Sequence, residues 1–300
     1  VELARTQPVS EPGAGYAYNN LNYTVLAWLV EEVSGHSFAS YLDTELFRPL
    51  DLTGAGLLGS NAEPMAGVAR GHDPVGVDGL QGERPTDRSI LVGAGSMHAT
   101  ALDLWKWLDG LAGRAILASL PDSVVFEYVG RRENVRDQPA IVADGWDGIG
   151  YAAHVNFLRD DRLAVIVLSN LNIAGVTREI AGGVLSLAVG EAPEVSEPIA
   201  RSLPADSART LAGRYTFGDD FYVPGGTLDI VERDGALLDE SRDPAGALIP
   251  LAGGGFLYRP VWARIRFLRD ADGPVKPAGT KKDKVADLLI RAEQLKSTLN

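Results

Sequence analysis

The chain contains no cysteine among its 300 residues. Disulfide bonds, thiolate metal sites and a cysteine nucleophile are therefore excluded. Histidines are also few, and none of them has the short spacing of a helical or finger-type metal site: His36, His72, His98 and His154. We interpret all four as ordinary residues and expect neither a metal ion nor another cofactor.

Positive charge is scarce as well. Lys and Arg number 28 against 40 Asp and Glu, which gives a formal net charge of −12. Nucleic acid and anionic membrane surfaces are poor partners for so acidic a chain. No apolar run reaches the roughly 18 residues of a membrane span. No signal peptide opens the sequence, although a truncated start would have lost one, so both the cytoplasm and export from a bacterium fit.

Apolar residues make up 45% of the chain, an ordinary share for a soluble globular protein. Apolar periodicity predicts helices over 21–34, which ends at Gly35, over 37–47, and over 101–111, which Thr100 caps. The stretch between the last two helices, 53–95, is rich in Gly, Pro and Asp. A long irregular stretch in a compact domain is usually functional or lid-like.

In the second half of the chain, the spacing of the apolar residues changes. Short apolar runs at 153–157 and 164–168 predict an antiparallel hairpin, and 173–189 predicts a helix that packs back on it. Ser169 and Asn170, at the end of the second run, are interpreted as a turn and helix cap. Beyond a Pro-containing stretch at 191–207, evenly spaced short strands with Asp-Gly turns predict a small antiparallel sheet or barrel.

Tyr18 and Asn20 stand immediately before the first predicted helix, after a Glu-Pro-Gly turn. A phenol and a carboxamide on a rigid bend are what a serine acyl-transfer site needs as proton carrier and substrate clamp. The structural alternative is that Asn19 or Asn20 caps the helix while the tyrosines pack beneath it.

Four segments in order resemble one family. They are Tyr18-Asn19-Asn20 with its following helix, the run 30–35, the corner at 47–52, and Val92–Leu104, which is similar to the pattern Gly-Gly-x-x-Ser-Thr-x-x-Asp-Leu. Over residues 8–190 the chain resembles the penicillin-binding-protein-like serine hydrolases, which include class C β-lactamases, D-aminopeptidases, DD-peptidases and esterases. The resemblance implies an α/β (α+β) β-lactamase/transpeptidase-like domain with Tyr18 and Asn20 in its Tyr-x-Asn motif.

The family's nucleophile lies in a Ser-x-x-Lys motif, where a helical turn separates the hydroxyl from the amine that activates it. No serine of this chain has Lys three residues later, and Lys106 is the only lysine before position 276. We therefore expect the hydrolase domain to be N-terminally incomplete, with its nucleophile on a missing N-terminal segment or a partner chain.

The chain also departs from the family's third motif, which is Lys-Thr-Gly or His-x-Gly before a Gly-aromatic pair. Gly150-Tyr151 fits the pair, and the motif itself would fall on Asp144, Gly145, Trp146 and Gly148 in one of three registers. None of these registers supplies Lys or His. A cation for a substrate carboxylate is thus absent, whereas a glycine could present its backbone N–H as an oxyanion donor. Trp146 has a purely structural interpretation as well.

We expect four regions: a hydrolase domain at 1–190, a linker at 191–207, a lipocalin-like β domain at 208–275, and a Lys-rich helical tail at 276–300, which holds five of the six lysines. The lipocalin resemblance is carried by Leu-x-Gly-x-Tyr at 211–215 and by the closing Phe-x-Arg-Asp at 267–270. The tail has a composition unlike the rest and suggests a segment of separate origin.

Two functions of different classes follow. The first is a hydrolase that acts on small esters, amides or peptides once its nucleophile is supplied. The second is a catalytically inactive binding or regulatory protein on the same scaffold. A third interpretation, a carrier that binds an apolar ligand within 208–270, is the weakest because few strands are available to enclose a cavity.

Overall fold

A computed structural model describes the following residues of the chain: 11, 13–14, 18–58, 66–83, 87–113, 115, 119, 131–135, 138–146, 150–193, 200–216, 226–265 and 267. The fold divides into two compact units, each of which is described by itself. The first unit comprises residues 1–68 and 85–110, and the second comprises 69–84 and 111–300. The Lys-rich tail and Gly148 lie outside the described residues.

The first unit is mainly helical. Helix α1 (Asn20–Ser34) begins at the cap Asn19 and ends at Gly35, as the sequence predicts. The second predicted helix is divided: α2 (Phe38–Leu42), capped by Ser37, continues into a π-helical turn at Asp43–Phe47. Helix α3 (Ala101–Ala112) follows the short strand β4 (Met97–His98), which pairs with β1 (Gly56–Leu57). A 3-10 helix spans Arg88–Leu91.

A compact apolar cluster joins the elements of the first unit. Leu42, Phe47 and Leu52 are buried in it, and Trp107 of α3 packs against them. The approach of α3 is close, because a Cβ added at Gly110 would lie 2.7 Å from Leu50 Cδ2. The core of this unit therefore lies between α2, the following corner and α3.

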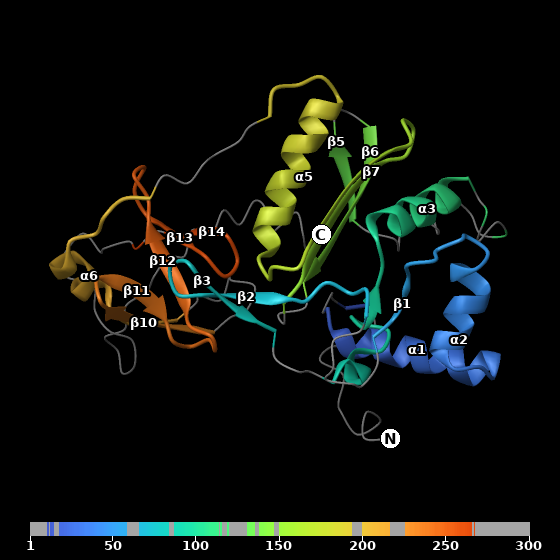
Figure 1. The fold of residues 1–300 in the computed structure, drawn as a ribbon, viewed down its shortest axis with the longest axis horizontal. Helices are drawn as coiled ribbons and strands as arrows, with labels where there is room; N and C mark the ends of the chain where they lie inside the picture. Colours follow the sequence, from blue (N-terminus) through green and yellow to red (C-terminus); the bar gives the residue numbers. More distant parts are fainter. Residues whose placement is uncertain are drawn as a thin grey trace. The chain divides into compact units, whose positions relative to one another are not determined.

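The second unit contains a four-stranded antiparallel sheet in the order β5-β6-β7-β8. Its strands are β5 (Arg131–Val135), β6 (Gln138–Trp146), β7 (Ala152–Leu158) and β8 (Leu163–Ser169). The predicted hairpin is confirmed as β7–β8, and the predicted helix as α5 (Ala174–Ala188), which lies across the sheet (Figure 1). Helix and sheet bury a shared core, formed by Ala140, Leu158, Val165, Ala181 and Leu185.

The C-terminal part of the second unit is a six-stranded antiparallel meander preceded by α6 (Ala205–Leu211), a helix that the sequence did not predict. Its strands are β9 (Gly213–Thr216), β10 (Thr227–Arg233), β11 (Ala236–Asp239), β12 (Gly246–Pro250), β13 (Phe256–Tyr258) and β14 (Ala263–Ile265). Among the described residues no pairing joins β9 to β14, so the sheet is a curled half-barrel rather than a closed barrel.

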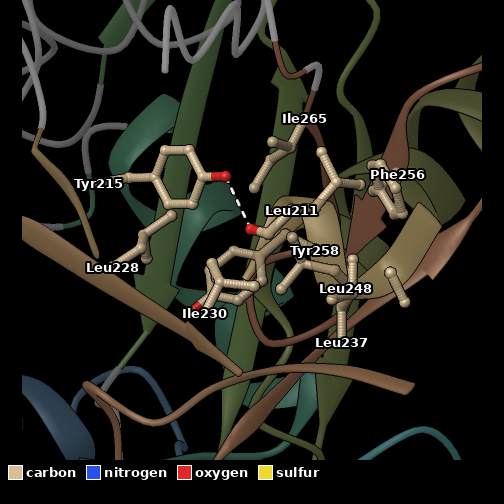
Figure 2. Packing of buried hydrophobic residues seen from close by; sticks show 10 residues of the cluster. Leu211, Tyr215, Leu228, Ile230, Leu237, Leu248, Phe256, Tyr258 and Ile265 are labelled. Atoms are coloured by element: carbon tan, nitrogen blue, oxygen red, sulfur yellow. Dashed lines mark hydrogen bonds between the residues drawn. The ribbon is translucent and has the colours of Figure 1, made fainter. Parts of the chain in front are cut away.

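Aromatic side chains fill the concave side of this curled sheet. Tyr215 of β9 is buried, and its hydroxyl donates to the Leu211 carbonyl oxygen at 2.7 Å (Figure 2). Burial raises the pKa of Tyr215 to about 12, so the phenol stays protonated, and remains a donor, into the alkaline range. The Phe267 ring lies 5.1 Å from the Tyr215 ring and 5.2 Å from that of Phe256. Offset and edge contacts of this kind hold the two sheet edges around one core.

The predicted lid-like stretch 53–95 contains regular structure in its middle: β2 (His72–Val75) and β3 (Gly79–Gly82) form a hairpin. Its first strand bonds to the end of β8, because His72 N–H donates to the Asn170 carbonyl at 2.9 Å. Its tip is held by Arg259, whose Nη1 donates to the carbonyls of Val75, Gly76 and Gly79 at 2.9–3.0 Å. The hairpin therefore ties the C-terminal sheet to the α/β layers of the second unit, and Figure 1 shows it beside β12.

Candidate active site

Tyr18 and Asn20 lie together at the start of α1. The Tyr18 hydroxyl donates to Asn20 Oδ1 at 3.0 Å, and the Tyr18 side chain is half exposed, at 51%. Helix capping falls to Asn19, whose Oδ1 accepts from Leu21 N–H at 2.8 Å. The capping alternative is thus correct for Asn19, and it leaves the Asn20 amide to pair with the phenol.

The segment that resembles Gly-Gly-x-x-Ser-Thr supports the helix bearing this pair. At Gly93 the backbone has φ +81°, and an added Cβ would lie 2.8 Å from Ala27 Cβ and still closer to the Tyr23 carbonyl oxygen. Real Cβ atoms do not approach so near, and a side chain is strained at this φ. Gly93 therefore lets its loop rest directly on the backbone of α1, two turns from Asn20.

Asp103 closes the same segment with a buried capping box. Its Oδ2 accepts from Thr100 N–H at 2.9 Å and from Thr100 Oγ1 at 2.6 Å, while its own N–H donates to Thr100 Oγ1 at 3.1 Å. Gly54 N–H adds a third donor to the carboxylate at 3.3 Å. Desolvation raises the pKa of Asp103, but the hydrogen bonds from Thr100 and Gly54 outweigh it, so the net shift is downward.

The third-motif residues end strand β6. Asp144, Gly145 and Trp146 are its last three residues. Each pairs with a residue of β7: Asp144↔His154, Gly145↔Ala153 and Trp146↔Ala152. Successive side chains of a strand alternate between its faces. Asp144 points to the face covered by α5, because its Oδ2 accepts from Arg178 Nη2 at 2.7 Å. Gly145 therefore faces the opposite side.

A polar network holds the Asp144 carboxylate. His154 Nδ1 lies 2.5 Å from Asp144 Oδ1, and His154 Nε2 lies 3.1 Å from Asn156 Oδ1. The side chains of His154 and Asp144 are 2% and 19% exposed, and that of Arg178 is 32% exposed. A partly buried carboxylate that contacts both a guanidinium and an imidazole is fixed in place, so this network orients the end of β6.

Sequence reasoning missed this network and treated His154 as ordinary. A signal was available in the alternation of β7, whose inward positions include His154 and Asn156 between Ala152 and Leu158. Two polar residues at successive inward positions of a buried strand require partners. His154 has its partner Asp144 on β6, and Asp144 in turn binds Arg178 of α5. These positions depend on a strand register that periodicity alone does not give.

The Gly-aromatic pair after β6 has a local structural cause. Gly150 has φ +124°, and an added Cβ there would lie 2.9 Å from the Cα of Gly71. The hydroxyl of Tyr151 donates to the Ala69 carbonyl at 2.7 Å and lies 3.0 Å from Glu83 Oε1. The pair therefore binds the strands around the β2–β3 hairpin to the start of β7.

Ser169 and Asn170 do not cap α5. The Ser169 hydroxyl accepts from Leu171 N–H at 3.0 Å, and Asn170 Nδ2 donates to the Arg70 carbonyl at 2.8 Å. The helix begins after Ile173 without a side-chain cap. The turn part of the sequence prediction is therefore confirmed, and its cap part is wrong.

Comparison with known proteins establishes the family. The model of the Beta-lactamase family matches residues 2–188. The chain belongs to this family. Over 98 residues it is 34% identical to a protein of Bacillus subtilis (strain 168) named "Putative penicillin-binding protein PbpX", a match that covers 32% of this chain and 24% of that protein. The family membership confirms the resemblance to penicillin-binding-protein-like serine hydrolases.

Solved structures share the fold at low identity. The octameric penicillin-binding protein homologue from Pyrococcus abyssi matches 87% of this chain and 63% of its own, with TM-score 0.53 and 18% identity. The D-stereospecific amidohydrolase from Streptomyces sp. matches 59% of this chain and 57% of its own, with TM-score 0.51 and 18% identity. The chain thus spans less than two thirds of each of these relatives, and the β-lactamase/transpeptidase-like fold is the common feature.

Two features are absent from the residues that the structure describes. Among them, no cluster of three or more His, Asp or Glu side chains could hold a metal ion. None of the helices described is long and apolar enough to cross a membrane.

Proposed function

We propose that this chain carries the proton-transfer and substrate-positioning part of a serine acyl-transfer hydrolase. The main support for this proposal is the hydrogen bond between Tyr18 and Asn20 at an exposed helix start, in a chain of the Beta-lactamase family. Tyr18 passes the proton of the attacking seryl hydroxyl to the leaving oxygen or nitrogen. Asn20, aligned by the phenol, binds the amide or ester of the substrate.

The nucleophile in this proposal lies outside the 300 residues. None of their serines has Lys at the third following position. An ordinary tyrosine phenol has a pKa of about 10, so it accepts a proton near neutral pH only beside a cation. The lysine of a Ser-x-x-Lys helix supplies such a cation one helical turn from its serine.

The substrate is proposed to lie along the end of β6. Gly145 faces away from α5, and among the described residues an added Cβ there would meet only Ala153 Cβ within 4 Å, at 3.5 Å, an ordinary contact. Space beside a glycine suits a backbone N–H that donates to a developing oxyanion. Asp144 positions this strand, and Trp146 and Gly148 complete the proposed substrate-binding segment. Without Lys or His in the motif, small esters, amides and peptides are favoured over penicillins.

The test compares two polypeptides, the 300-residue chain and the full product of its gene (the extended protein), in which the proposal places a Ser-x-x-Lys segment before residue 1; where the gene encodes no such segment, the proposal fails. A fluorophosphonate probe should label the extended protein on that serine and leave the shorter chain unlabelled. In the extended protein, Tyr18→Phe should lower kcat for p-nitrophenyl acetate by about 10²–10⁴-fold. Tyr23→Phe is the matched control, because Tyr23 lies in the first turn of α1 with its ring 5.7 Å from that of Tyr18. This substitution should leave kcat within about twofold.

The second candidate is a non-catalytic binding or regulatory protein. The absent Ser-x-x-Lys pattern favours it, since a scaffold does not guarantee the chemistry of its relatives. Absence of labelling in both polypeptides would decide for this candidate. Equal turnover of the Tyr18→Phe and wild-type extended proteins would remove Tyr18 from the mechanism.

For the chain as a whole we propose the regions given by the sequence: hydrolase domain 1–190, linker 191–207, β domain 208–275 and tail 276–300. The curled six-stranded sheet supports a β domain that begins near residue 208. Its likeness to a lipocalin stays a proposal. Limited proteolysis should cut first within 191–207 if that stretch is a linker.

A further inference from the structure

A hollow of about 660 Å³ lies beside the C-terminal sheet. Its walls are α6 with the segment before it, the turn that joins β12 to β13, and Phe267 after β14. Small-molecule sites commonly occupy about 300–1,000 Å³, so the hollow is large enough for a ligand. It contains none of the residues assigned to acyl transfer.

The floor of the hollow is apolar and rigid. Leu211 and Phe256 are 9% and 6% exposed, and both belong to the buried core of the sheet (Figure 2). Phe267 packs on the core through its edge contact with Phe256. Side chains that are already fixed lose little conformational entropy when a ligand covers them.

The described part of the rim is polar and positively charged. The exposed residues Arg201, Ser207 and Thr210 lie on it, and none of the described residues that line the hollow is Asp or Glu. The backbone of Arg201 is anchored, since its N–H donates to the Pro250 carbonyl at 2.9 Å beside the bridge Ala200↔Leu251. In a chain of net charge −12, a rim whose described residues include an arginine and no carboxylate favours anions.

We propose that this hollow binds an amphiphilic monocarboxylate, such as a medium-chain fatty acid. The alkyl chain lies on Leu211, Phe256 and Phe267, and the carboxylate pairs with the Arg201 guanidinium at the rim. An apolar floor with one charged group at its margin matches a ligand with one charged end. The site is independent of the proposed acyl transfer, so it can be measured whether or not the protein hydrolyses a substrate.

The test is a ligand-observed NMR titration of the full chain with decanoate, with decyltrimethylammonium as the cation of matched chain length. Decanoate has about a dozen non-hydrogen atoms, for which a Kd of about 0.1–1 mM is expected. Arg201→Gln should weaken decanoate about tenfold, since a charge-assisted hydrogen bond is lost. It should not weaken the cationic amphiphile.

A second variant blocks the hollow instead of changing its charge. Gly253 lines it, has no positive φ, and has no atom of a described residue within 4 Å of an added Cβ. Gly253→Leu should therefore fold and reduce decanoate affinity by about tenfold or more. Gly182→Leu on α5 is the matched control, because its Cβ also enters open space and it should leave the affinity unchanged.

The outcomes separate clearly. Selective decanoate binding that both Arg201→Gln and Gly253→Leu weaken supports the site. The proposal is overturned if decanoate fails to bind up to about 10 mM, if the cation binds equally well, or if Arg201→Gln leaves decanoate affinity unchanged. Should Gly253→Leu fail to fold, Arg201→Gln alone decides.

Discussion

Replacing Gly93 by alanine should loosen helix α1 and displace Tyr18 and Asn20. The added methyl group would lie 2.8 Å from Ala27 Cβ and closer still to the Tyr23 carbonyl oxygen, on a backbone with φ +81°. A non-glycine residue in the left-handed region costs about 1–2 kcal/mol, and overpacking adds about 1–3 kcal/mol. The helix or the loop must move, so Gly93→Ala should cost about 2–5 kcal/mol in total.

Gly95→Ala is the matched control two residues along the same loop. Its added Cβ would meet Leu91 Cδ1 at 3.8 Å and Leu91 Cβ at 3.9 Å, ordinary contacts, and its φ is not in the left-handed region. The substitution should change stability by less than about 1 kcal/mol, in either direction. The pair therefore compares the same chemical change with and without close approach to α1.

Hydrogen exchange read by mass spectrometry is the direct assay, because it reports the opening of α1 rather than of the whole chain. Gly93→Ala should reduce protection of the α1 peptide by about 30-fold or more, given a tenfold change for each 1.4 kcal/mol. Gly95→Ala should leave it nearly unchanged. Equal protection in the two variants would refute the idea that Gly93 is needed for close packing on this helix.

Two further predictions concern the buried carboxylates. Asp103→Asn should cost the first unit about 1–2 kcal/mol at neutral pH, by weakening the capping box with Thr100. The folded-state pKa of Asp103 is lowered. The stability difference between wild type and Asp103→Asn is therefore present above about pH 4, the pKa of an aspartate in the unfolded chain, and it fades as the pH falls through the folded-state pKa. A stability difference that stays constant in urea unfolding from pH 7 to 2 would contradict this prediction. Arg178→Met should lower the stability of the second unit by about 1–2 kcal/mol, because Asp144 loses a charged donor. Arg209→Met is the control, since it removes an exposed ion pair and should change the stability by less than about 0.5 kcal/mol. Equal shifts of the melting temperature in the two variants would count against a stabilising network around Asp144.

Local patterns predicted the elements whose signals are contained within one segment. Helix α1 ends at Gly35, and the hairpin β7–β8 lies within one residue of its expected ends. Helix α6 was missed because its seven residues, Ala205–Leu211, lie in a stretch punctuated by proline. The β2–β3 hairpin was missed for another reason: its strands are held by distant partners, such as Arg259.

In the candidate site, too, local contacts differ from contacts that depend on distant segments. Tyr18 and Asn20 are joined by a hydrogen bond because two residues at a helix start meet by local geometry, and their role in a site stays a prediction. The network of Asp144, His154 and Arg178 was not predicted, because it depends on strand register and on where α5 crosses the sheet. Closure of the C-terminal barrel was likewise undecidable from strand spacing, which is the same in open and closed meanders.

The structure also shows which of the family-like residues have a role in the scaffold. Gly93, Asp103 and Gly150 each have a packing or capping role that would preserve them in an inactive protein. Tyr18 and Asn20 have a smaller role of this kind: Asn19 already caps α1, and two described contacts of Tyr18, the hydrogen bond to Asn20 and the ring contact with Tyr23, join exposed side chains. Helix capping therefore does not explain why a phenol and an amide meet at this helix start. The case for retained chemistry accordingly depends on this pair rather than on the wider resemblance, which is why Tyr18→Phe is the decisive substitution.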